Sequence, residues 1–195
     1  MNQSGISVVQ ARTSIKSINV ALEGLTPLLV NRFHEDAQLE ASSGVHSRKE
    51  RLTPEDDAKE RLYWNDEIGC YLPAENLRQS IIAAGSRHKI GRKGASGDLA
   101  AALYIEPFAL PLAGDWHVDT RPVVIPATRG RVLRHRPMFD HWRLELTLRV
   151  DAQLVDLGLV RMVVDDAGNY EGVGDFRPAR KGPYGRFMVV RWELC

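Results

Sequence analysis

The segment 172–187, GVGDFRPARKGPYGRF, combines three kinds of residue that together suit the binding of a polyanion. Its glycines are Gly172, Gly174, Gly182 and Gly185, its cations are Arg177, Arg180, Lys181 and Arg186, and its aromatic residues are Phe176 and Tyr184. Glycine lets backbone N–H groups approach a ligand, cations neutralise phosphates, and aromatic rings stack on bases. The segment therefore predicts contact with an extended nucleic acid. The alternative is a long loop whose glycines only satisfy turns.

Two further stretches supply basic candidates for phosphate contacts. The stretch 129–143, RGRVLRHRPMFDHWR, provides Arg129, Arg131, Arg134 and Arg136. In a hairpin strand Arg134 and Arg136 share a face and could flank a phosphodiester backbone, although a solvated sheet face is the alternative. The remaining candidates belong to an expected helix and the basic run that follows it, where cations also complement the helix dipole. They are Arg78, Arg87, Lys89, Arg92 and Lys93.

Residues for catalysis or metal binding are sparse. The six histidines are scattered, and the sequence contains no GxSxG, HExxH, CxxC or GxxxxGK[ST] motif. Of the two cysteines, Cys70 is expected to be a small core residue. Metal-independent RNA cleavage with His135 or His141 as general base is an alternative, but we expect a non-catalytic protein without metal or cofactor.

The charge distribution supports a polyanion-binding second half. Residues 1–75 carry 8 Lys and Arg against 12 Asp and Glu, whereas residues 76–195 carry 18 against 13. Arginine outnumbers lysine by 20 to 6, which favours bidentate phosphate recognition, although a G+C-rich genome would give the same ratio. The sequence has no apolar run of transmembrane length and no recognisable leader, so we expect a cytoplasmic protein with no membrane partner.

The hydrophobic periodicity predicts a mixed α+β domain over 1–195. A strand is expected in 14–30, then a projecting insertion over 32–66, which is expected to be mobile over 33–51 and holds a short helix capped by Thr53. A helix follows Pro73, a flexible loop covers 91–97, and a strand covers 103–112.

The second half of the chain continues the pattern. A hairpin is expected around Arg129 and Gly130, followed by a half-buried strand over 142–150. A helix over 154–167 should stop at Gly168 and Asn169, and a last strand follows the glycine-rich segment. Reduced to its core, this order is β-α-β-β-α-β, which predicts a ferredoxin-like (RRM-like) fold with a long insertion after the first strand.

The chain resembles the RAMP superfamily of CRISPR-associated proteins. The resemblance lies in this order of elements and in two stretches, GVGDFRPARKGPYGRF and YLPAENLRQSIIAAG. The insertion over 32–66 is similar in position to the protruding loop of that family's backbone subunits. The resemblance implies antiviral defence and a protein that binds single-stranded RNA, or less favourably DNA, and self-assembles along it as an oligomer or filament. Other effector-complex subunits are then possible partners. The alternative is a structural or interaction protein, for example a phage assembly component, whose arginines make ion pairs with a neighbour.

Overall fold

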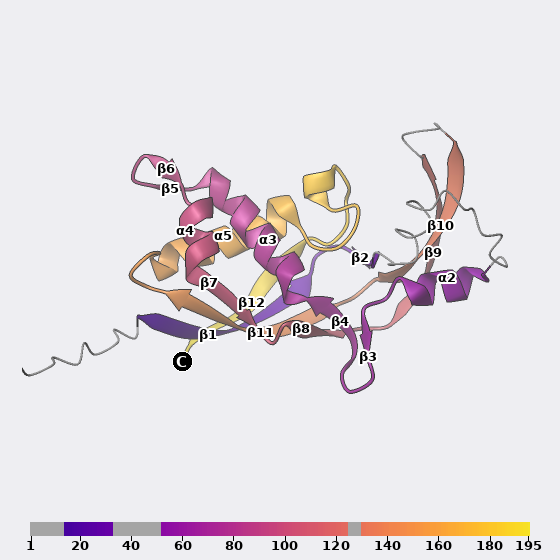
Figure 1. Ribbon diagram of the computed structural model, residues 1–195, viewed down its shortest axis with the longest axis horizontal. Helices are drawn as coiled ribbons and strands as arrows, with labels where there is room; N and C mark the ends of the chain where they lie inside the picture. The colour runs from indigo at the N-terminus through magenta and orange to yellow at the C-terminus, as the bar shows by residue number, and fades with distance from the viewer. Residues whose placement is uncertain (1–13, 33–51, 125–129) are drawn as a thin grey trace, which may run out of the picture.

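A seven-stranded sheet organises the computed structural model, which describes residues 14–32, 52–124 and 130–195 (Figure 1). Strand β1 (Ile15–Gly24) lies between β12 (Phe187–Leu194) and β11 (Arg143–Asp151) and pairs antiparallel with both. The predicted alternation in β11 is confirmed, because its leucines and Val150 are buried while Arg143, Glu145 and Arg149 are exposed. Period-two patterning therefore gives this sheet one apolar and one polar face.

The other edge of β11 is shared by two shorter strands. β7 (Leu103–Glu106) pairs with its second half and β8 (Ala109–Ala113) with its first residues. The single strand predicted over 103–112 is thus divided, because Pro107 and Phe108 interrupt it. β4 (Gly69–Pro73) and β3 (Trp64–Asn65) extend the sheet beyond β8.

Three helices, α3 (Ala74–Ala84), α4 (Ser96–Ala102) and α5 (Leu157–Asp166), lie on one face of the sheet (Figure 1). The predicted helix after Pro73 is confirmed: Leu77 and Ile81 of α3 are buried against the core. The predicted second helix is confirmed in α5, which buries Val160, Val163 and Val164. The apolar stripes of these helices and the apolar face of the sheet form one continuous core.

The end of α5 differs from the prediction. The helical conformation does not end at Gly168 and Asn169. It continues as a π-helical turn, Ala167–Glu171, which ends at Gly172 with φ +67°. Gly168 is buried, and a Cβ there would overlap the carbonyl oxygen of Phe187. This glycine therefore permits close packing of the turn on β12 and does not terminate the helix.

The segment 91–97 was expected to be a flexible loop, and this prediction is wrong. β5 (Lys89–Ile90) and β6 (Lys93–Gly94) form a small antiparallel hairpin, the β5–β6 hairpin, and α4 begins two residues later. Ala95 and Leu99 are fully buried and anchor this segment. The sequence signal was weak because α4 is only seven residues long and is mostly made of small residues.

β9 (Trp116–Val124) and β10 (Arg131–Phe139) pair as the predicted hairpin and form an arm that projects from the main sheet (Figure 1). β2 (Leu28–Leu29) adds a third strand to the arm, so the strand predicted over 14–30 is broken between β1 and β2. At the break, the Nε1–H of Trp142 donates to the Thr26 carbonyl at 2.9 Å. Residues 125–129, which join β9 to β10 in the sequence and include Arg129, lie outside the described residues.

Helix α2 (Pro54–Glu60) lies beside the arm (Figure 1) and begins as the sequence predicts. Thr53 is its N-cap, and its Oγ1 accepts a hydrogen bond from the Asp56 N–H at 3.2 Å. Residues 33–51 of the predicted insertion lie outside the described part of the chain, so its mobility stays a prediction. In the described ranges, no helix has the length and apolarity needed to cross a bilayer.

Candidate nucleic-acid interface

The Gly-rich loop, residues 172–186, is hydrogen-bonded onto the chain that joins β1 to β2. The Val173 N–H donates to the Gly185 carbonyl at 2.9 Å and closes the base of the loop. The Gly185 N–H donates to the Pro27 carbonyl at 2.8 Å, and the Asp175 N–H to the Leu29 carbonyl at 2.7 Å. These backbone groups hold the loop in place and are therefore not free to bind a ligand.

The glycines of the loop are explained by these close contacts. A Cβ at Gly174 would lie 2.6 Å from the Leu29 carbonyl oxygen, and a Cβ at Gly182 or Gly185 would overlap a backbone carbonyl of the loop. Gly172, Gly174 and Gly185 also have positive φ angles. The geometry thus favours glycines that satisfy turns and packing over glycines that expose the backbone to a ligand.

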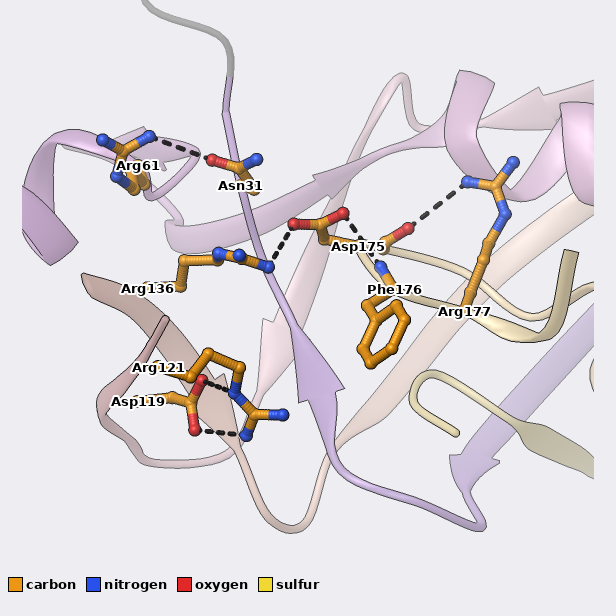
Figure 2. Close-up of polar contacts among 9 residues, drawn as sticks. Asn31, Arg61, Asp119, Arg121, Arg136, Asp175, Phe176 and Arg177 are labelled. Atoms are coloured by element: carbon orange, nitrogen blue, oxygen red, sulfur yellow. Dashed lines mark hydrogen bonds and ion pairs between the residues drawn. The ribbon is translucent and has the colours of Figure 1, made fainter. Parts of the chain in front are cut away.

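An ion pair joins the loop to the arm (Figure 2). Nη1 of Arg136 lies 2.7 Å from Oδ2 of Asp175, and Oδ1 of Asp175 accepts the Phe176 N–H at 2.9 Å. Arg136 is only 7% exposed. Its expected position on an exposed face beside Arg134 is therefore wrong, because the loop covers this part of β10.

An arginine that the sequence analysis did not select lies beside the loop. Arg121 in β9 makes two hydrogen bonds to Asp119, at 2.6 and 2.5 Å, and its Cζ lies 5.0 Å from the ring centroid of Tyr184. The hydrogen bond to Asp119, and further contact with Tyr184, raise the pKa of Arg121. Its local signal was the Asp-x-Arg spacing on a strand whose register places Arg121 opposite Arg134.

Phe176 and Tyr184 form an aromatic pair on the loop, with ring centroids 6.1 Å apart. Phe176 is 41% exposed and has φ +46°. A bulky residue rarely adopts a positive φ, and such strain is found at sites that hold a side chain in a fixed position. The pair therefore presents one exposed ring next to the arm.

Seven of the predicted cations are exposed, and in the described part of the chain none of them has an ion-pair partner. They occupy three segments: Lys89, Arg92 and Lys93 in the β5–β6 hairpin, Arg180 and Lys181 in the Gly-rich loop, and Arg131 and Arg134 in the arm. Figure 1 shows the hairpin, the loop and the outer end of the arm on the helix side of the main sheet. These seven residues are called the free cations below.

Four other predicted cations make internal contacts. Arg78 donates to the carbonyls of Ala100 and Leu103, and so tethers α4 to α3. Arg87 pairs with Glu171 at 3.2 Å, over the ring of Tyr170. The remaining two brace the loop, since Arg177 donates to the Gly174 carbonyl and Arg186 to the Asn169 carbonyl.

The face of the sheet opposite the helices carries charges that neutralise one another. Glu145 lies 3.0 Å from both Arg143 and Arg191, and Arg149 pairs with Glu106 at 2.7 Å. Hydrogen bonding from Arg191, with its positive charge, lowers the pKa of Glu145. Because these arginines already have carboxylate partners, this face is a poor candidate for holding a polyanion.

Histidines and cysteines do not assemble into a centre in the described residues, where no group of three or more His, Cys, Asp or Glu could hold a metal ion. His135 shares a hydrogen bond with Thr120 at 2.8 Å. Cys70, which was predicted to be a core residue, is only partly buried and packs against the core; this burial raises the pKa of its thiol, whereas Cys195 is exposed.

This difference predicts selective alkylation. Because the thiolate is the reactive form, we expect iodoacetamide at pH 8 to modify Cys195 well before Cys70, by roughly tenfold in rate. Peptide mass spectrometry over a time course measures both sites in the same sample. Equal rates in the folded protein would contradict the partial burial of Cys70.

A scan against protein-family models finds no match for this sequence, and neither does a comparison with curated proteins. The function must therefore be inferred from the geometry of the residues themselves.

Proposed function

We propose that this protein binds single-stranded nucleic acid, RNA in preference to DNA, and that it does so without catalysis. The observation that carries the proposal is the set of seven free cations, spread over three segments on the helix side of the sheet. None of these seven side chains is paired with a carboxylate in the described residues, whereas Arg143, Arg149 and Arg191 on the opposite face form ion pairs with glutamates. Phosphate neutralisation by such side chains supplies most of the affinity for a single strand.

The aromatic pair adds a second kind of contact. Phe176 is exposed on the same loop as Arg180 and Lys181, and stacking of a base on an aromatic ring contributes about 1–3 kcal/mol. Because the loop's glycines serve internal packing, side chains and not loop N–H groups provide the contacts. The bound nucleic-acid strand would then run from the β5–β6 hairpin over the Gly-rich loop to the arm.

We further propose that the core is ferredoxin-like and that the chain is a relative of the RAMP backbone subunits. The strand order β12-β1-β11-β7, with α3 and α5 on one face, supports this proposal. Self-assembly along the ligand is part of it, and other effector-complex subunits are candidate partners. β12 supports self-assembly, because it is an edge strand that exposes Met188, Val190 and Leu194.

Removing free cations tests the proposal. We expect the variant Arg92→Ala/Lys93→Ala/Arg134→Ala/Arg180→Ala to bind a 30-nucleotide oligo-U more than tenfold more weakly than the wild type. The slope of log K against log salt should also become shallower by about 2 to 3, at roughly 0.7 per phosphate contact. Fluorescence anisotropy at several salt concentrations measures both quantities, and oligo-dT of the same length tests the preference for RNA.

The matched control is Arg143→Ala/Arg149→Ala, which removes two exposed arginines from the opposite face. It should bind like the wild type, and both variants should keep their melting temperature. Unchanged binding by the four-residue variant would remove the free cations from the interface. If the wild type binds no nucleic acid but forms oligomers that dissociate when these cations are removed, the result would support the assembly-protein alternative.

A further inference from the structure

A pocket of about 120 Å³ lies where the Gly-rich loop meets the start of α3. Its polar walls are Asn31 after β2, Tyr63 before β3, Asn76 in the first turn of α3, and Asp175 in the loop. Val30 and Leu72 add aliphatic surface. Four segments distant in the sequence therefore build one concave site beside the proposed path of the strand.

The polar groups of this pocket retain unused hydrogen-bonding capacity. Oδ1 of Asn31 accepts from Arg61 at 3.1 Å, which orients the amide and leaves its Nδ2 hydrogens available (Figure 2). The Asn76 side chain has no hydrogen-bond partner among the described residues. Each oxygen of Asp175 accepts one hydrogen bond, from Arg136 or from the Phe176 N–H, and retains a second lone pair.

This chemistry disfavours a phosphate and favours a base. The Asp175 carboxylate in the wall repels an anion. The positive charge of Arg136 is already paired with this carboxylate and is not available to a phosphate. A neutral, flat ring with both donors and acceptors would instead satisfy the pocket, with its faces against Tyr63 and the aliphatic side chains. A pocket of this size suits one small ring more readily than a larger ligand.

We propose that the pocket receives one unstacked uracil or thymine base of the bound strand. Such a base carries one ring N–H between two carbonyls, which matches one carboxylate acceptor, Asp175, and two amide donors, Asn31 and Asn76. In the same orientation cytosine presents a ring-nitrogen lone pair to the Asp175 carboxylate and an amino group to one amide donor, so both of these hydrogen bonds are lost. This inference rests on the proposed function and specifies which base the interface selects.

A comparison of two pyrimidine strands tests the proposal. At fixed salt, we expect the wild type to bind twelve uridines about tenfold more tightly than twelve cytidines. Asn76→Ala should reduce this ratio below threefold with little change in affinity for cytidines. Alanine is favoured at this helical position and Asn76 makes no internal hydrogen bond among the described residues, so the fold should persist. Phe176→Ala is the control. It should reduce the affinity for both oligonucleotides by the same factor, because stacking on an aromatic ring does not distinguish uracil from cytosine.

A second measurement separates failure of the pocket from failure of the interface. Uridine and cytidine nucleosides, which carry no phosphate, are titrated while the side-chain amide signals of Asn31 and Asn76 are followed by NMR. Shifts with uridine and not cytidine, retained in the variant lacking four free cations, are expected. If both strands bind equally and neither nucleoside shifts these signals, the pocket proposal is overturned while the proposed function stands. If no strand binds but uridine shifts the signals, the proposed function fails and the pocket remains a base-selective site.

Discussion

Replacing Gly185 by alanine is expected to lower the free energy of unfolding by about 2–5 kcal/mol. Gly185 has φ +68°, and a Cβ there would overlap the Val173 carbonyl oxygen, which cannot move without breaking the base of the Gly-rich loop. Left-handed backbone costs a non-glycine residue about 1–2 kcal/mol, and overpacking adds about 1–3 kcal/mol. Urea unfolding followed by circular dichroism measures the change.

Two other glycines separate the backbone and packing contributions. Gly91 has φ +61° with no atom near its would-be Cβ, so Gly91→Ala should cost only about 1–2 kcal/mol. Gly97 lies in α4 with open space around it and an ordinary φ, so Gly97→Ala should be neutral or stabilise by up to about 1 kcal/mol. If Gly185→Ala is no more destabilising than Gly91→Ala, the loop does not pack as described.

Breaking the ion pair between Arg136 and Asp175 is expected to have an effect that depends on which partner is removed. Asp175→Ala should cost about 3–4 kcal/mol of stability, because it leaves the charge of Arg136 buried without a partner. Arg136→Met should cost less, about 1–2 kcal/mol, because the Asp175 side chain is 33% exposed and can be hydrated. Denaturant unfolding of both variants gives the comparison.

The double variant, Asp175→Ala/Arg136→Met, completes the cycle. It should be more stable than Asp175→Ala alone, since the apolar methionine no longer places an uncompensated charge in the interior. Additive losses would mean that the two side chains do not interact. A larger loss for Arg136→Met than for Asp175→Ala would contradict the burial of Arg136.

The elements that the sequence predicted well are those with a local signal. The alternation of Leu144, Leu146 and Leu148 specifies a strand with one buried face, and the spacing of Leu77 and Ile81 specifies a buried helix stripe. Thr53 followed by Pro54 likewise defines a helix start without reference to the rest of the chain. These features depend on residues within one or two turns of each other.

The features that sequence reasoning missed depend on distant partners. In the sequence Gly168 has the features of a helix stop, and only the packing of Phe187 against it shows its role. Arg136 likewise reads as a surface cation, and only its ion pair with Asp175 shows that it is buried. Arg121 escaped notice because its aromatic partner, Tyr184, is on another element. The pocket is assembled from four separate segments, so no single stretch carries its pattern.

The position of β1 constrains how the protein can fold during translation. β1 pairs with β11 and β12, and about 120 residues separate its last residue from the first residue of β11. At a synthesis rate of about 5–20 residues per second, roughly 6–24 s pass between synthesis of Ile18, Val20 and Leu22 and synthesis of their first strand partner, β11, and β12 follows later still. In that interval β1 is an unpaired apolar strand, which makes the nascent chain a client for chaperones and makes fragments that end before β11 prone to aggregation.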